Sequence, residues 1–220
     1  MTLDDHLSYT QAQAASGYEF SNGSRYQLPE HPFTPPPELR TQNVVRHDIV
    51  IVGGGWVGLS LACALDQYGV KAVLLDEDNT VGIKGASSRG IFYAQKTLEI
   101  FKRLDIYERM AAKGVQWSVS RTFARLDKVY SLDLASATTY NASLQPPFVN
   151  IQQFYVEGFL VEKLMAAPDP TVELRRNNRI TGFKQNNEPT TLDITTAAGN
   201  YTIEAVHVTD CSGARSPFRA

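Results

Sequence analysis

The chain has 220 residues, of which 43% are hydrophobic and 20% are charged, with a formal net charge of −2. This length is enough for a sizeable core, as one large domain or as one domain and part of another. The nearly balanced charge argues against nucleic acid or an acidic membrane surface as partner. The two cysteines, Cys63 and Cys211, lack CxxC spacing, so we expect them to pack and not to form a disulfide or bind a metal.

Residues 1–46 are polar and contain a proline cluster at Pro32, Pro35, Pro36 and Pro37. Consecutive prolines fix φ and remove hydrogen-bond donors, so we expect a flexible or extended arm without a helix. Its aromatic residues leave open that the arm lies along the folded body. Residues 1–14 lack the apolar core of a signal peptide, and no apolar stretch is long enough to span a membrane, so we expect a cytoplasmic protein.

The most specific motif lies in residues 48–65, where an apolar run ends in glycines and passes into an amphipathic helix. Gly53 permits a tight turn, Gly55 lets a pyrophosphate approach the backbone, and Gly58 lets the helix pack closely on the sheet. The helix N-terminus favours the phosphates. A second apolar run ends in Asp76, where a carboxylate can accept hydrogen bonds from an adenosine ribose. The motif therefore predicts a dinucleotide-binding βαβ unit.

Hydrophobic periodicity predicts the remaining elements. Helical spacing indicates helices at residues 95–104, 106–113 and 153–166, with Gly114 as the C-cap of the second. Turn residues and alternating patterns indicate four later strands, at 172–174, 180–185, 191–196 and 201–209. This order predicts an α/β sheet with an antiparallel appendage.

Residues 115–134 have strand character, and we expect Asp127 and Lys128 to turn a hairpin there. Trp117, Phe123 and Tyr130 are expected to pack in the core of this sheet, with an aromatic pocket as the alternative.

The closing segment, residues 205–219, is a strand that runs into a glycine-containing loop. Ligands collect at the carboxyl ends of strands in a doubly wound sheet, so this loop would bring Asp210, Ser212 and Arg215 to the same nucleotide. An ordinary surface loop is the alternative.

Several other polar residues are assigned structural roles. We expect His47 and His207 to be structural. We expect a cluster of three arginines to form a solvated edge: Arg175, Arg176 and Arg179. No metal site is expected, because residues 76–82 lack the glycine and glutamate that a calcium loop needs.

Five motifs taken together resemble the single-component FAD-dependent aromatic hydroxylases, nearest to the 3-(3-hydroxyphenyl)propionate and phenol hydroxylase branch. They are GGGWVG (53–58), SRGI (88–91), TLEIF (97–101), NIQQFYVE (150–157) and DCSGARS (210–216). The resemblance covers residues 47–219 and is to the N-terminal portion of such enzymes, which continue into a Gly-Asp motif and most of a substrate domain.

The resemblance implies an α/β, Rossmann-like FAD-binding fold of the glutathione reductase type, with an antiparallel appendage and the start of a substrate-domain sheet. The implied domains are an arm (1–46), an FAD-binding domain (47–114 and 150–220) and partial substrate-domain strands (115–149).

The resemblance also assigns residue roles. Asp76 matches the acid on the adenosine ribose, Arg89 the arginine near the FAD pyrophosphate, and Gln153 the glutamine near the ribityl chain. The closing loop resembles an Asp-Gly motif that touches FAD and the nicotinamide cofactor, although Ser212 stands where an aspartate is usual. Likewise, Trp56 stands where proline is commoner. The candidate cofactor-binding residues are Gly53, Gly55, Trp56, Val57, Gly58, Asp76, Glu77, Arg89, Gln153, Asp210, Ser212 and Gly213.

The implied activity is hydroxylation of a phenolic or other aromatic compound by a monooxygenase that uses FAD, NAD(P)H and O₂. No catalytic side chain is assigned, because the cofactor carries the redox chemistry. The alternatives are an FAD-binding dehydrogenase-like protein and a catalytically silent FAD- or nucleotide-binding module. The expected partners are a small aromatic substrate and O₂, with a homodimer as one option and neither nucleic acid nor membrane.

Overall fold

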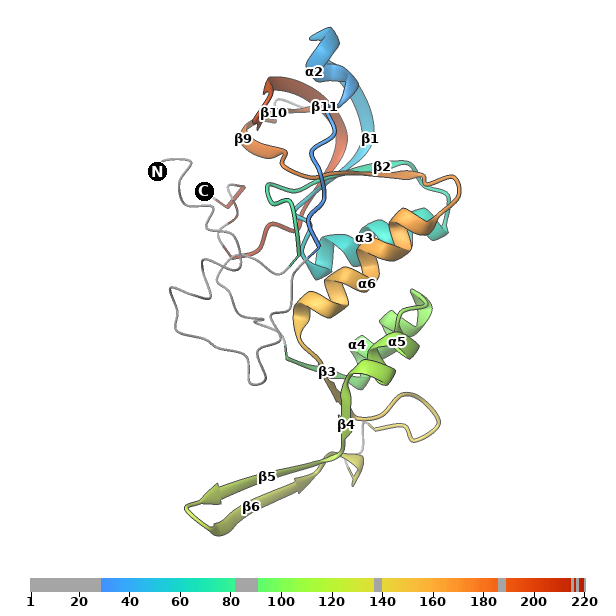
Figure 1. Ribbon diagram of the computed structural model, residues 1–220, viewed down its shortest axis with the longest axis vertical. Coiled ribbons are helices and arrows are strands. Elements are labelled where there is room, and N and C mark those ends of the chain that lie inside the picture. Colours follow the sequence, from blue (N-terminus) through green and yellow to red (C-terminus); the bar gives the residue numbers. More distant parts are fainter. Residues whose placement is uncertain are drawn as a thin grey trace. The chain divides into compact units, whose positions relative to one another are not determined.

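The computed structural model describes residues 29–81, 91–136, 140–185, 189–214, 216 and 218–219 (Figure 1). The chain divides into two compact units. The first comprises Met1–Ser87 and Val161–Ala220, and the second is Ser88–Leu160.

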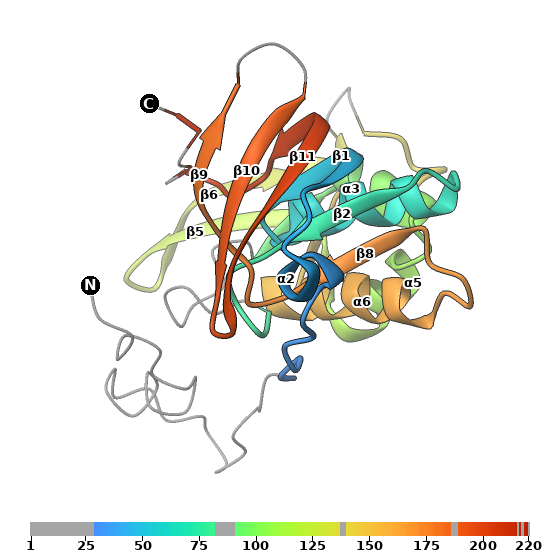
Figure 2. The ribbon, with the colours of Figure 1, turned by 90° about the horizontal axis from the view of Figure 1, so that it is seen from above.

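The first unit is built on a six-stranded sheet in the order β8-β2-β1-β11-β10-β9 (Figure 2). The first four of these strands are parallel, and β10 and β9 continue the sheet in antiparallel pairing. The strands are β1 (Val45–Val52), β2 (Ala72–Leu75), β8 (Val172–Arg175), β9 (Arg179–Lys184), β10 (Thr190–Thr196) and β11 (Gly199–Asp210). The predicted α/β sheet with an antiparallel appendage is confirmed.

The register aligns the carboxyl ends of the parallel strands. Val52 of β1 pairs with Leu75 of β2 and with Asp210 of β11, and Leu75 pairs with Arg175 of β8. The residues that follow all four strands therefore emerge along one edge of the sheet.

The core of the first unit lies on both faces of the apolar strands β1 and β2. All four residues of β2 are buried, as expected for a parallel strand covered on both faces. Helix α3 (Trp56–Gln67) contacts β1, β2 and β8, and buries Leu59, Ala62 and Cys63. On the other side, Val50 and Val73 pack in one cluster with side chains of β10 and β11.

The expectation that the proline-rich arm contains no helix is wrong. Helix α2 spans Pro37–Thr41, with Pro37 at its first position, where the N–H that proline lacks has no intrahelical partner. Glu38 of this helix is buried, and Leu39 packs against the core cluster. The described part of the arm thus lies along the folded body, and β1 begins at Val45, before the expected start at His47.

The second unit contains a three-stranded antiparallel sheet in the order β3-β7-β4. Its helices match the predicted ones closely. The elements are β3 (Phe92–Ala94), α4 (Gln95–Arg103), α5 (Tyr107–Lys113), β4 (Val115–Trp117), β7 (Phe148–Asn150) and the start of α6 (Gln153–Ala166). The short strands β3 and β7 were not expected from the sequence, since three residues carry too little pattern.

Gly114 caps α5 as predicted, but with an extended backbone at φ −86° instead of a left-handed one. A Cβ at this position would lie 2.6 Å from Cγ1 of Val149. Close packing against β7 therefore explains the glycine.

A two-stranded ribbon, β5 (Val119–Ala124) and β6 (Asp127–Asp133), is followed by the 3-10 helix η2 (Leu134–Ser136). The turn lies at residues 125–126, with Arg125 at φ 55°, so the expected turn at Asp127 and Lys128 is wrong by two residues. Phe123 and Tyr130 are exposed, which contradicts their expected core packing. Among the residues that the structure describes, no third strand pairs with the ribbon, and both side chains stay exposed there.

Candidate cofactor site

The glycine turn after β1 has the geometry that the motif predicts. Gly53 adopts φ +100°, and its N–H donates a hydrogen bond to the Leu75 carbonyl at 2.8 Å. A Cβ at Gly53 would lie 2.7 Å from the Cys211 carbonyl oxygen, and a Cβ at Gly58 would overlap the Gly53 carbonyl oxygen. The turn and the first turn of α3 therefore accept only glycine at these two positions.

The N-terminus of α3 is open to an anion. Gly55 is its N-cap, no side chain caps the helix, and its first turn contains no acidic residue. Val57 is half exposed and Trp56 partly buried in this turn. Because the first main-chain N–H groups of a helix lack internal partners and carry partial positive charge, this end suits a pyrophosphate.

Asp76 follows β2 and is tied to the glycine turn. Its Oδ2 accepts a hydrogen bond from the Gly54 N–H, and its Oδ1 accepts from the Asp78 N–H at 3.0 Å. Arg176 Nη1 lies 3.1 Å from the same Oδ1. A carboxylate has about four acceptor positions. Contacts among the described residues occupy three of them, one on Oδ2 and two on Oδ1.

The loop after β11 meets the same turn, as its parallel pairing with β1 requires. The Cys211 N–H donates to the Val52 carbonyl at 2.7 Å. Asp210 accepts hydrogen bonds from the Ser212 N–H, the Ser212 hydroxyl and the Ser216 hydroxyl. Burial acts to raise the pKa of Asp210, but these hydrogen bonds outweigh it and lower the pKa. Asp210 thus organises the loop in which Gly213 adopts φ +88°.

The remaining candidate cofactor-binding residues do not lie in the glycine turn or the closing loop. Glu77 lies at the exposed end of β2, 3.5 Å from Arg179 Nε. Gln153 belongs to the second unit, where its Nε2 donates to Glu157 Oε1 at 2.7 Å. Arg89 and Arg215 lie outside the described residues. The structure therefore brings the glycine turn, Asp76 and the closing loop to one edge, while the ligand roles of all twelve candidates stay predictions.

The expected solvated arginine edge is wrong for two of its three members. Arg175 and Arg176 are each 5% exposed, whereas Arg179 is exposed. Arg175 Nη2 contacts Glu38 Oε1 at 3.1 Å and Glu173 Oε2 at 2.8 Å. Both buried guanidinium groups are thus paired with carboxylates, which is the condition for burying a charge. The local sequence does not signal this burial, because Glu38 and Asp76 are remote in the chain and Glu173 is the one nearby partner among those named.

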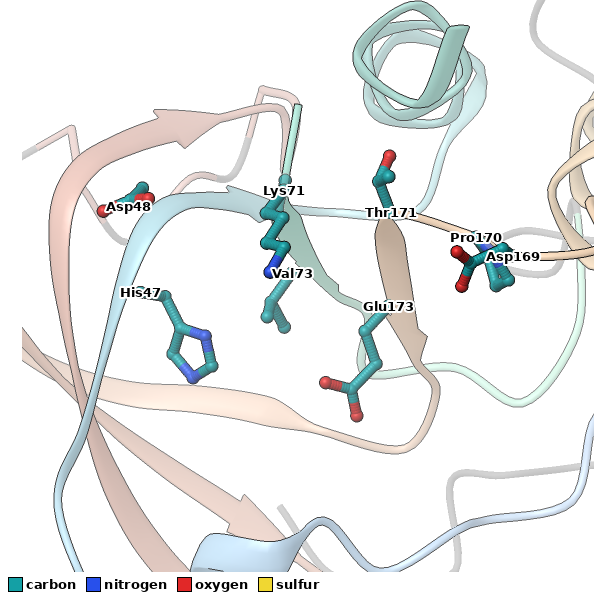
Figure 3. A pocket seen from close by; sticks show the side chains of 9 residues that line it. His47, Asp48, Lys71, Val73, Asp169, Pro170, Thr171 and Glu173 are labelled. Carbon is teal, nitrogen blue, oxygen red and sulfur yellow. The ribbon is translucent and has the colours of Figure 1, made fainter. Parts of the chain in front are cut away.

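His47 has the structural role expected of it, since its Nε2 lies 3.1 Å from Oε1 of buried Glu38. It also lines an open hollow of about 400 Å³, into which Lys71 and Glu173 also point (Figure 3). This hollow lies toward the amino ends of β1, β2 and β8. It is therefore separate from the carboxyl edge, where α/β sheets bind nucleotides.

Neither a metal site nor a membrane-spanning helix is seen in the part of the chain that the structure describes. No group of His, Cys, Asp or Glu side chains there could hold a metal ion. No helix among those residues is long and apolar enough to cross a membrane.

Residues 46–220 match the family described as the FAD binding domain. This chain belongs to that family. The match confirms the predicted fold and the predicted cofactor, FAD. The FAD-binding domain begins one residue after the start of β1, so helix α2 lies before the region that the family shares.

Curated relatives include enzymes of two reaction types. The chain is 27% identical over 172 residues to rifampicin monooxygenase of Streptomyces venezuelae, covering 78% of this chain and 33% of that protein. It is 25% identical to 3-(3-hydroxy-phenyl)propionate/3-hydroxycinnamic acid hydroxylase of Mycolicibacterium smegmatis (78% and 29% covered). It is 27% identical to dialkyldecalin synthase of Streptomyces rugosporus (78% and 33%). The chain spans about a third of the length of these relatives.

Solved structures show the same fold. The p-nitrophenol 4-monooxygenase PnpA of Pseudomonas putida DLL-E4 superposes with a TM-score of 0.70 at 26% identity, covering 81% of this chain and 44% of PnpA. The flavin-dependent monooxygenase PieE, solved in complex with FAD and substrate, gives a TM-score of 0.67 at 27% identity, covering 78% and 31%.

Proposed function

We propose that this FAD-binding domain serves a monooxygenase that hydroxylates a phenolic or other aromatic compound with NAD(P)H and O₂. The observation that supports the proposal is the carboxyl edge of the sheet, where the Gly53 turn, the α3 N-terminus and Asp76 lie together in a member of an FAD-binding family. The names of the hydroxylase and monooxygenase relatives supply the reaction type and the aromatic substrate class.

Bound FAD supplies the redox chemistry, taking electrons from NAD(P)H and activating O₂. In this proposal the main-chain N–H groups at the start of α3 hold its pyrophosphate. Asp76 Oδ2 accepts a hydrogen bond from the adenosine ribose. Arg89 and Gln153 contact the pyrophosphate and the ribityl chain, and the loop at Asp210 lies beside the cofactor. These groups bind and orient, and none of them transfers a proton.

The setting of the enzyme is also part of the proposal. We expect it to act in the cytoplasm on a small aromatic substrate, as a monomer or a homodimer. The balanced charge of the chain supports the absence of a nucleic-acid partner.

A second candidate function is favoured by one observation. Dialkyldecalin synthase has the same 27% identity to this chain as rifampicin monooxygenase of Streptomyces venezuelae, and its name denotes a synthase. An FAD-binding domain that supports a reaction other than oxygenation, or that is catalytically silent, therefore stands as the alternative.

The first test is the visible absorbance spectrum of the purified 220-residue chain after FAD is added and the excess removed. We expect retained flavin bands, because the glycine turn, the start of α3 and Asp76 all lie in the first unit. A folded but colourless chain would contradict FAD binding by these residues.

For the reaction, O₂-dependent NAD(P)H consumption stimulated by phenols supports the monooxygenase. FAD retention with no phenol-stimulated consumption in the full-length protein supports the alternative.

A further inference from the structure

The loop that carries Asp76 is held in place by two other segments of the chain. The first is the turn after β8, where Arg176 Nη1 donates to Asp76 Oδ1 and to the Thr80 carbonyl oxygen, both at 3.1 Å. In the same turn, the Asn178 N–H donates to the Asp76 carbonyl oxygen at 2.8 Å. These contacts lie within residues 46–220, the region that the family shares. They fix the loop to the turn at Asp76 and at Thr80.

The second segment is the N-terminal arm, which precedes the shared region. The His31 N–H donates to the Asn79 carbonyl oxygen at 2.7 Å, and His31 Nε2 is buried. Burial lowers the pKa of His31, and the positive charge of Arg176 lowers it further, so the imidazole lies near the guanidinium group that holds the loop. The arm therefore contacts the loop between the two points that Arg176 fixes.

The arm is anchored to the sheet at another point. Glu38 of α2 contacts Arg175 and His47 through Oε1, at 3.1 Å in each case. Proline fixes φ, so a proline-rich stretch has few conformations to lose when it is held at both ends. Between His31 and Glu38 the chain contains four prolines: Pro32, Pro35, Pro36 and Pro37. The arm is thus a stiff connection between the sheet and the Asp76 loop.

Order in this loop bears directly on nucleotide binding, because Asp76 also joins the loop to the glycine turn. Asp76 Oδ2 accepts a hydrogen bond from the Gly54 N–H, next to the N-terminus of α3. A loop that is already held in its binding conformation loses less conformational entropy when a ligand binds, and the gain appears mostly as slower release. Loss of the contact at Asn79 would let the loop open locally and carry Asp76 away from the turn.

We propose that the N-terminal arm is a strap on the nucleotide site: the His31 N–H, through the Asn79 carbonyl, keeps the Asp76 loop in its FAD-binding conformation and slows the release of FAD. The inference rests on FAD occupying the site described under the proposed function. His31 is a positioning residue, since it acts through the loop and not by contact with the cofactor. The strap adds to the site a segment from outside the region that the family shares.

The first test removes the main-chain donor from the full 220-residue chain. His31→Pro lacks the N–H, whereas His31→Ala keeps it, and both lack the imidazole, so the pair isolates the hydrogen bond to Asn79. Glu30→Pro is the control for a new proline at the exposed neighbouring position. Flavin fluorescence measures Kd for FAD and the rate of FAD release after dilution. Urea unfolding without FAD checks that each variant is folded.

We expect His31→Pro to raise Kd for FAD about three- to tenfold relative to His31→Ala, as the loss of one hydrogen bond does. Most of this change should lie in the release rate. Glu30→Pro should stay within about twofold of wild type, because its side chain is exposed and the His31 N–H remains.

The second test needs no substitution, because coupling between two sites is reciprocal. If the arm contact slows FAD release by strengthening FAD binding, saturating FAD must stabilise the arm contact. NMR measures hydrogen exchange of the His31 amide in the wild-type chain with and without FAD. We expect FAD to slow this exchange at least about threefold, while amides of the exposed strand β6 keep their rates. An arm that only stabilised the fold would open locally at the same rate in both states.

The results that would overturn the inference are distinguishable. A wild-type chain that binds no FAD removes the proposed function and the inference with it. A wild-type chain that binds FAD, with equal Kd in His31→Pro and His31→Ala, overturns the strap alone. So does an unchanged exchange rate of the His31 amide when FAD is added to wild type, which decides the question even if His31→Pro does not fold.

Discussion

At the scale of single residues, two glycines inside helices have opposite surroundings. Gly58 lies in the first turn of α3, where a Cβ would overlap the Gly53 carbonyl oxygen and approach Cys211 Cβ to 3.3 Å. Gly158 lies in the middle of α6, where a Cβ would meet nothing within 4 Å beyond the helix itself. Helix propensity alone favours alanine over glycine at both positions by about 1 kcal/mol.

These two glycines give a matched pair of substitutions. We expect Gly58→Ala to destabilise the chain by about 1–3 kcal/mol, as for overpacking, and to weaken flavin retention. Gly158→Ala should stabilise it by about 0.5–1 kcal/mol. Urea unfolding followed by circular dichroism measures both. Equal effects of the two changes would show that the close contact at Gly58 is not a constraint.

At the scale of elements, helix α2 is held to the sheet by charge as well as by apolar packing. Glu38 is 2% exposed and its Oε1 contacts both His47 Nε2 and Arg175 Nη2. Arg175 Nη1 in turn lies 3.4 Å from the Tyr201 hydroxyl, which donates to Asn178 Oδ1 at 2.7 Å. A buried network thus connects the arm to the turn after β8, which carries Arg176.

Removing Glu38 should therefore be costly. Glu38→Ala leaves the buried Arg175 without one of its two carboxylate partners, and loss of a buried partner typically costs about 3–5 kcal/mol. Glu30→Ala, an exposed position in the same arm, should change the free energy of unfolding by no more than about 0.5 kcal/mol. Chemical denaturation at neutral pH tests the pair. A small effect at Glu38 would mean that the network does not hold the arm.

The same carboxylate predicts an acid dependence. Burial acts to raise the pKa of Glu38, but its backbone hydrogen bond, Arg175 and His47 outweigh burial and lower the pKa below 4.5. A carboxyl group whose pKa falls on folding stabilises the folded state above its unfolded pKa, and this contribution is lost as the pH falls through the folded value. Between about pH 5 and pH 3, wild type should lose stability more steeply than Glu38→Ala. If the free energy of unfolding fell equally steeply with pH in wild type and in Glu38→Ala, the assigned role of the Glu38 carboxylate would be contradicted.

At the scale of the whole molecule, the elements differ widely in how much they bury. Residues 50–52 of β1 and all four residues of β2 are buried in the six-stranded sheet, whereas all seven residues of β6 are exposed. Leu126 at the ribbon turn is 95% exposed. A two-stranded hairpin is marginally stable in water by itself. The ribbon therefore adds little to the stability of this chain.

Native-state hydrogen exchange should resolve this difference. We expect amides of β1, β2 and β11 to exchange only through global unfolding, and those of β5 and β6 to exchange at least about 100-fold faster by local opening. Slow amide exchange in β5 and β6 at low protein concentration would contradict this expectation, because it would show that the ribbon does not open locally.

Much of the architecture was readable from local patterns. The helix at 153–166 and the four C-terminal strands match the prediction to within about two residues, because hydrophobic periodicity is a local property. The Gly53 turn and Asp76 were also readable, since a tight turn and a strand-end acid leave a short spacing signature. The prediction placed the ribbon turn at Asp127 and Lys128, because polar residues often form turns. The turn instead contains Arg125 with a positive φ, which arginine rarely adopts and which the sequence therefore does not indicate.

The sequence by itself determined the α/β fold, the glycine turn and the acid at the end of β2, because each depends on neighbouring residues. Only the tertiary structure decided that Arg175 and Arg176 are buried and that the proline-rich arm contributes a charged anchor. Arg176 lies 100 positions from Asp76, and Arg175 lies 137 positions from Glu38. The Arg176–Asp76 pair exists because parallel β2 and β8 bring their carboxyl ends to one edge. The Arg175–Glu38 pair exists because helix α2 packs against the sheet. In both cases a charge is buried only where the fold supplies its partner.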